Sequence, residues 1–120
     1  MKNLLIVLTL AFCIVACKLD DKTPLLIGQW QGISWKVNGV ASDRNAKAVK
    51  FQFNADKTYS TSYENESEHG IFRLNFGNLY TTGENKIEKM VKLSTLTADT
   101  IVMDMNRAGT AEEIILVKTK

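Results

Sequence analysis

The feature that most constrains the fold is an alternation of apolar and polar residues that begins near Gly28 and recurs to the end of the chain. In one segment Val49, Phe51 and Phe53 are separated by single polar residues. Successive side chains of a β-strand point to opposite faces, so this period of two gives a strand one apolar and one polar face. Antiparallel sheets with one buried face are built from such strands. The sequence therefore predicts an all-β domain.

Turn-forming residues divide this region into eight segments with strand character. The predicted strands are residues 29–38, 49–53, 59–63, 70–75, 78–82, 86–96, 100–106 and 111–118. Nearly all connections between them are short, which predicts a meander in which each strand pairs with the next. Eight strands are enough to close into an antiparallel up-and-down barrel. Only the connection from Gly39 to Ala48 is long, and we expect it to lie near the mouth of the barrel, where it has the length of a lid.

The N-terminal segment has the pattern of a secretory signal peptide. Lys2 supplies a positive charge, and Leu4 to Val15 is an apolar run. As a helix this run spans about 18 Å, which is short of the roughly 30 Å that a transmembrane helix must cross. We therefore expect residues 1–16 to form a signal helix that is removed. An apolar first helix of a cytoplasmic protein is the alternative.

The end of this segment carries a more specific signal. Ile14-Val15-Ala16-Cys17 resembles the lipobox of bacterial lipoproteins, in which the cysteine thiol is alkylated by a diacylglyceryl group. The resemblance implies cleavage before Cys17, acylation such as with palmitate, and attachment to a membrane of the cell envelope, most naturally the outer membrane. An ordinary secreted protein cut nearby is the alternative. Residues 17–27 are polar at first and predict a tether. Its acidic residues resemble a surface-export signal, so the cell surface and the periplasmic face are both compatible locations.

A second resemblance concerns the domain at residues 28–120. The tripeptide Gly28-Gln29-Trp30, in the company of the leader, a Phe-x-Phe strand and the run His69-Gly70-Ile71-Phe72, looks like the small lipocalin-like lipoproteins of the Bacteroidota. The likeness covers Leu26 to Lys118. It implies a lipocalin-like barrel in which Gly28 and Trp30 have structural roles, and it implies ligand binding. The last strand lacks the arginine that stacks on the tryptophan in that family, and Lys118 is the nearest cation.

Several function classes are disfavoured by composition. The chain has a net charge of +2 with acids and bases interspersed, so it has no basic face for nucleic acid. Its two cysteines are separated by the predicted cleavage, which leaves no disulfide. The chain holds one histidine, His69, beside three glutamates, and we interpret residues 64–69 as a solvated turn. We expect no metal, no cofactor and no catalytic residues, and therefore not an enzyme.

The binding hypothesis depends on aromatic residues. Trp35, Phe51, Phe53, Tyr59 and Phe72 fall on successive predicted strands, and inward-facing rings would line a site for a small apolar or ring-bearing ligand. The alternative is that these rings fill the interior. The protein would then act through its outer surface, as a protein–protein interaction, inhibitor or structural module of the envelope. An interior cavity favours the first hypothesis, and a filled interior with an exposed apolar patch favours the second.

Overall fold

The computed structural model describes residues 21–120, which form one antiparallel sheet of nine strands. A one-turn helix and a short 3-10 helix accompany the sheet. In chain order the elements are α1 (Thr23–Leu26), β1 (Gly28–Val37), β2 (Val40–Ala41), η4 (Ala46–Ala48), β3 (Lys50–Phe53), β4 (Thr58–Tyr63), β5 (Glu66–Asn75), β6 (Asn78–Gly83), β7 (Glu88–Leu96), β8 (Thr100–Arg107) and β9 (Thr110–Lys118).

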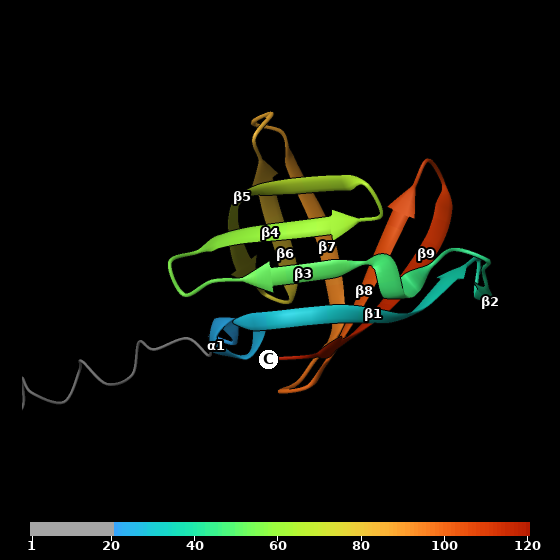
Figure 1. Cartoon of the computed structure of the whole chain (residues 1–120), viewed down its shortest axis with the longest axis horizontal. Coiled ribbons are helices and arrows are strands. Elements are labelled where there is room, and N and C mark those ends of the chain that lie inside the picture. Colours follow the sequence, from blue (N-terminus) through green and yellow to red (C-terminus); the bar gives the residue numbers. More distant parts are fainter. Residues whose placement is uncertain (1–20) are drawn as a thin grey trace, which may run out of the picture.

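The sheet closes on itself because its first and last long strands pair (Figure 1). The pairing of β1 with β9 runs from Trp30 opposite Lys118 to Val37 opposite Glu112. From β3 onward, each strand pairs with the next in sequence. Strands β1 and β3 to β9 therefore make the eight-stranded up-and-down barrel that the sequence predicted, while β2 only extends the edge of β1.

Two local predictions differ from the structure. Strand β5 begins at Glu66, so the solvated turn expected over residues 64–69 is wrong except at its first two positions. The alternation was hidden there because both faces of this part of β5 carry polar side chains. The predicted tether at residues 17–27 overlaps α1, whose Thr23 and Leu26 are buried, so the folded body begins before Gly28.

The long connection between β1 and β3 lies against the barrel wall. Strands β1 and β3 pair only from Gly28 to Gln31, and the connection covers the rest of this seam (Figure 1). Its close approach requires the glycine at position 32, because a Cβ atom there would lie 2.2 Å from the Ala46 carbonyl oxygen. The Gly32 amide donates to the Val49 carbonyl at 2.9 Å.

The two ends of the barrel differ. At the closed end, α1 covers the opening: Leu26 is fully buried, and its carbonyl accepts the Trp30 indole N–H at 2.8 Å. The opposite end, called the mouth below, is bordered by the turns at residues 38–39, 64–65, 84–87 and 108–109. The predicted signal helix and Cys17 lie outside the described residues. Within residues 21–120 no helix has the length and apolar character needed to span a membrane.

Candidate functional site at the barrel mouth

The mouth contains a buried carboxylate at the start of β9. Glu112 shares its face of the strand with Ile114 and Leu116, which point into the core, and only 5% of the residue is exposed. Its Oε1 atom accepts the indole N–H of Trp35 at 2.8 Å. A buried carboxylate is costly unless its oxygens are matched by donors and positive charge. Positive charge should therefore lie close to this carboxylate.

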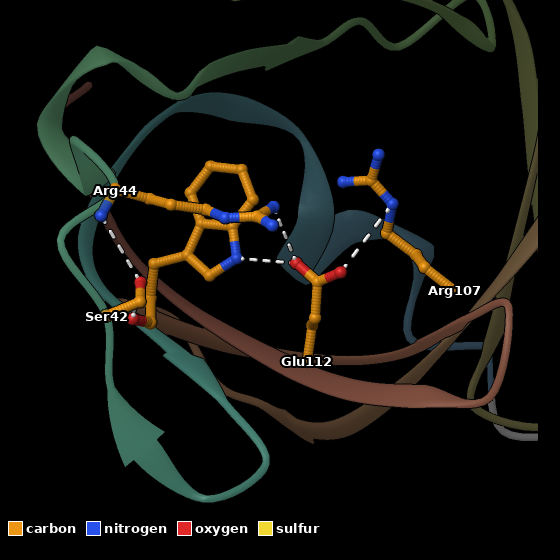
Figure 2. Close-up of polar contacts among 5 residues, drawn as sticks. Ser42, Arg44, Arg107 and Glu112 are labelled. Carbon is orange, nitrogen blue, oxygen red and sulfur yellow. Dashed lines mark hydrogen bonds and ion pairs between the residues drawn. The ribbon is translucent and has the colours of Figure 1, made fainter.

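Two arginines from different segments approach the Glu112 carboxylate (Figure 2). Arg44 Nη1 lies 3.1 Å from Oε1, and Arg107 Nε lies 3.6 Å from Oε2. The Arg44 guanidinium also lies over the Trp35 ring, 5.1 Å from its centroid, in a cation–π arrangement. The carboxylate thus joins the long connection, the end of β8 and the start of β9 at one point of the mouth.

The long connection is held to this point by a second contact. The Ser42 amide and hydroxyl both donate to the Trp35 carbonyl, at 3.1 and 2.6 Å. The Arg44 amide in turn donates to the Ser42 hydroxyl at 3.4 Å. Because Ser42 is bonded to the Trp35 carbonyl and Arg44 lies over the Trp35 ring, this part of the connection lies at the edge of the mouth, close to where the sequence placed it.

A small hollow lies on the other side of the mouth. Its volume is about 290 Å³, and its lining includes Thr61, Tyr63, Glu66, Glu68 and Lys89. The Tyr63 ring meets the Trp35 ring edge to face, with centroids 5.3 Å apart. This aromatic pair connects the hollow to the Glu112 cluster. The mouth therefore presents the Tyr63 ring, backed by the buried Trp35 and flanked by carboxylates and cations.

The lining of the hollow is largely polar, and one of its carboxylates reaches the buried Tyr59. Glu68 Oε2 accepts the Tyr59 hydroxyl at 2.8 Å, and Lys89 Nζ lies 3.5 Å from the other carboxylate oxygen. Burial, together with the adjacent Glu68 carboxylate, raises the pKa of Tyr59 to about 12. The Glu68 side chain passes over Gly83, where a Cβ atom would lie 2.6 Å from it. The phenol is thus a neutral hydrogen-bond donor throughout the physiological pH range.

The five aromatic residues that the sequence proposed for ligand binding occupy two regions. Phe53, Tyr59 and Phe72 are buried, and the Phe53 ring packs against both of the others, with centroids 6.5 and 5.1 Å apart. Phe51 stacks on Phe53 at 5.5 Å and is partly buried. Trp35 alone of the five belongs to the Glu112 cluster. Four of the rings therefore pack together, and the remaining one stands at the mouth.

The residues given structural roles lie at the closed end. Trp30 is 1% exposed, and Lys118 Nζ lies 5.0 Å from its ring centroid. Lys118 therefore takes the place of the expected arginine, and it also donates to the Leu25 carbonyl at 3.3 Å. Gly28 has φ +138°, a backbone conformation that favours glycine, and a Cβ atom there would lie 2.6 Å from the Lys120 carbonyl oxygen.

The histidine lies away from these clusters. The His69 side chain is 72% exposed on the outside of β5, with Nε2 3.4 Å from a Glu84 carboxylate oxygen. Among residues 21–120 there is no grouping of three or more histidine, cysteine or acidic side chains arranged to hold a metal ion. Sequence reasoning missed Glu112 and Arg44, although the alternation of β9 places Glu112 in phase with Ile114 and Leu116.

Comparison with known proteins agrees with this architecture. The family model described as a lipocalin-like domain matches residues 26–103. A lipocalin-like protein from Bacteroides uniformis superposes with a TM-score of 0.59 at 14% identity, covering 78% of this chain and 98% of its own. An uncharacterized protein from Bacteroides eggerthii gives a TM-score of 0.54 at 14% identity, covering 77% and 98%. A search of the curated proteins finds no match.

The closed eight-stranded barrel, sealed at one end by a helix and a buried tryptophan, defines a class of small binding barrels. The match over residues 26–103 then settles the family: the chain belongs to the lipocalin-like domain family. Proteins of this class are in general binding modules rather than enzymes.

Proposed function

We propose that the mature chain is a binding module of the cell envelope, held to the membrane by lipid on Cys17, which takes a small ring-bearing molecule at the mouth of its barrel. The barrel fold and the family support the binding role. The leader and the lipobox-like sequence before Cys17 support the anchor. The two parts of the proposal have separate tests.

The observation that carries the binding role is the Tyr63 ring in the lining of a hollow of about 290 Å³, with the buried Trp35 ring packed edge to face behind it. Ligand sites in proteins begin at roughly 300 Å³, so the hollow stands at the lower limit and suits only a small molecule. Deeper in the barrel, Phe53, Tyr59 and Phe72 pack on one another. Within the described chain these packed rings leave no interior cavity among them, so we propose the ligand at the mouth, above the rings, and not inside the barrel as expected from the sequence.

The lining determines the ligand chemistry that we propose. An apolar ring would lie against Tyr63, because stacked or edge-to-face rings gain about 0.5–1.5 kcal/mol beyond the area they bury. Polar groups on the ligand would meet Glu68 and Lys89, which lie 3.5 Å from each other and are both reachable from the hollow. Glu68 and Lys89 already pair with each other, so a purely aliphatic ligand would gain no polar contact from either of them.

Native mass spectrometry of the chain purified from its own cells tests the binding role. We expect a small molecule to remain bound to the wild-type chain and to the control variant Tyr80→Ala. Tyr80 lies on the outside of β6, where Arg73 covers its ring at 3.9 Å, so it is a matched tyrosine away from the mouth. We expect Tyr63→Ala to lose the molecule. Equal retention by both variants would place the ligand elsewhere.

The anchor is tested by labelling growing cells with palmitate. We expect label on the wild-type chain and none on Cys17→Ser, which should remain unprocessed or leave the membrane. Fractionation and protease treatment of intact cells then locate the chain, with the outer membrane as our proposal and either face as a readable outcome. Labelling of Cys17→Ser, or normal membrane retention of it, would contradict lipidation at this residue.

A second function has its own supporting observation. Ile71 and Met90 are 60% and 55% exposed on the outside of β5 and β7, on either side of Tyr80. Exposed apolar side chains gathered on one face of a sheet are typical of a surface that contacts a partner. A barrel that repeatedly purifies without a small molecule, but with a partner protein lost on Met90→Lys, would favour this interaction role over ligand binding.

A further inference from the structure

We infer that the closed end of the barrel is a membrane-contact face, with the ring of Phe76 inserted into the lipid interface and the mouth directed away from the bilayer. This inference rests on the proposed anchor at Cys17. It adds an orientation and a second point of attachment that lipidation by itself does not require.

The first observation is the exposure of Phe76. Its side chain is 86% exposed, the largest value among the exposed large hydrophobic residues of the described chain. Phe76 and Gly77 form the turn between β5 and β6, with φ angles of 52° and 80°. Turns of this kind favour asparagine or glycine at both central positions. A phenylalanine there is unfavourable for the turn, and the described residues leave its ring almost fully exposed.

The other strained positions make the contrast clear. The remaining non-glycine residues with positive φ in the described chain are polar or small: Asn38, Lys57, Glu64, Lys86 and Ala108. Of the six non-glycine residues with positive φ in the described chain, Phe76 alone has a large apolar side chain. Local turn chemistry does not explain this ring, and burial against a contact beyond the described residues would make it favourable.

The second observation is the position of the anchor. Phe76 lines a groove of about 540 Å³ together with Asp21, Lys22, Lys57, Leu74 and Leu96. Asp21 follows Cys17 by four positions, and a fully extended chain spans at most about 3.6 Å per residue, or roughly 14 Å here. A lipid on Cys17 therefore keeps this groove within a short distance of the bilayer surface. Because the link to the lipid is this short, we expect the membrane surface to contact the groove.

The charges around the groove indicate how it would bind. Near this end four lysines (Lys22, Lys57, Lys118 and Lys120) are interspersed with three aspartates (Asp21, Asp56 and Asp99), and a net charge of 4 − 3 = +1 gives no strong positive field toward the membrane. Attachment should then come from burial of the Phe76 ring, and it should depend little on the fraction of anionic lipid. The mouth turns lie at the other end of the barrel, so the ligand would enter from the aqueous side.

The test uses the mature chain from Cys17, whose single thiol can be coupled to a maleimide lipid in vesicles of phosphatidylethanolamine and phosphatidylglycerol with brominated acyl chains. Phe76→Trp places a reporter in the proposed face, and Ile87→Trp places one at the mouth, where Ile87 is 57% exposed. Bromine quenches tryptophan on contact, and the wild-type signal of Trp30 and Trp35 is subtracted. Circular dichroism checks that each variant is folded.

We expect Phe76→Trp to be quenched on the vesicles and to shift its emission to shorter wavelength, with no change for Ile87→Trp. The result should be the same when phosphatidylglycerol is omitted. Equal quenching of the two reporters would overturn the inference. A blue shift of Phe76→Trp that grows with protein concentration in the absence of vesicles would also overturn it, because a second copy would then cover the ring.

Amide exchange of the wild-type chain gives an independent measurement that needs no variant. On vesicles, residues 75–78 should exchange more slowly than in solution, while residues 84–87 should be unchanged. Slower exchange at 84–87 alone would reverse the proposed orientation. Because the thioether to the vesicle is made chemically, these outcomes do not depend on lipidation in the cell. Failure of the anchor itself would instead appear as a mature chain that carries no acyl mass.

Discussion

Replacement of Glu112 by alanine should destabilise the barrel by about 2 kcal/mol. The buried Trp35 N–H loses its acceptor, and an unsatisfied buried donor costs about 1–3 kcal/mol. The side chains of Arg44 and Arg107 are 40% and 61% exposed, so water can replace the carboxylate as their partner. Loss of the two ion pairs therefore adds little to the free-energy cost. Release of the buried charge offsets part of the cost.

Glu112→Gln separates the hydrogen bond from the charge. The amide oxygen can still accept from Trp35, so the loss should be about 1 kcal/mol or less. Glu113→Ala is the matched control, since Glu113 is 36% exposed and its cation, Lys36, is 4.0 Å away; its effect should stay within about 0.5 kcal/mol.

Urea denaturation followed by circular dichroism measures these differences as shifts in midpoint at constant slope. In thermal unfolding, the alanine variant should melt roughly 10 °C lower. A glutamine variant as unstable as the alanine variant would show that charge, rather than the Trp35 hydrogen bond, is what holds the mouth together. If Glu112→Ala and Glu112→Gln both unfold at the wild-type midpoint, the cluster contributes nothing to stability.

Three further predictions concern the core and the hollow. Trp30→Ala should lose about 3–5 kcal/mol in urea denaturation, and a near-neutral result would contradict its role as the plug of the closed end. Gly70→Ala should cost about 1–3 kcal/mol in the same assay, because its Cβ would lie 1.9 Å from the Thr82 carbonyl oxygen; a stable variant would mean that β5 and β6 are less closely paired. Tyr59, whose pKa is raised to about 12, should keep its proton in ultraviolet titration until well above pH 10. Since the unfolded phenol ionises near pH 10, the stability that Tyr59 contributes is present below that pH and is lost between about pH 10 and 12. Glu68→Gln should lower the pKa of Tyr59 and so narrow this pH range. An unchanged titration of Tyr59 in that variant would contradict its hydrogen bond to Glu68.

Much of the fold followed from periodicity because the strand interiors are regular. The alternation around Phe51 and Phe53, and the short turns after it, are local signals that survive in the folded chain. The start of β5 did not follow, because its inward face meets the polar mouth instead of the apolar core. Glu66 and Glu68 there line the hollow, so no apolar residue marks the strand.

The site was harder to predict than the fold because it depends on which residues meet across the barrel. Trp35 was identified as a candidate from its ring alone, whereas its partner Glu112 stands 77 positions away. A charged pair such as Glu112 and Glu113 looks like a solvated strand edge in sequence. The two-residue alternation of β9 could have identified Glu112, because residues 112, 114 and 116 point to the same face and Ile114 and Leu116 mark that face as the inner one.

The indole N–H resonances of the two tryptophans give the most direct measurement of where the ligand binds. Trp35 stands at the mouth and Trp30 at the closed end, so a ¹⁵N-labelled mature chain reports on both ends in one spectrum. On addition of the small-molecule extract of the cells in which the protein occurs, we predict a shift of the Trp35 resonance and none of Trp30. A shift of Trp30 alone, or no shift of either, would contradict ligand binding at the mouth.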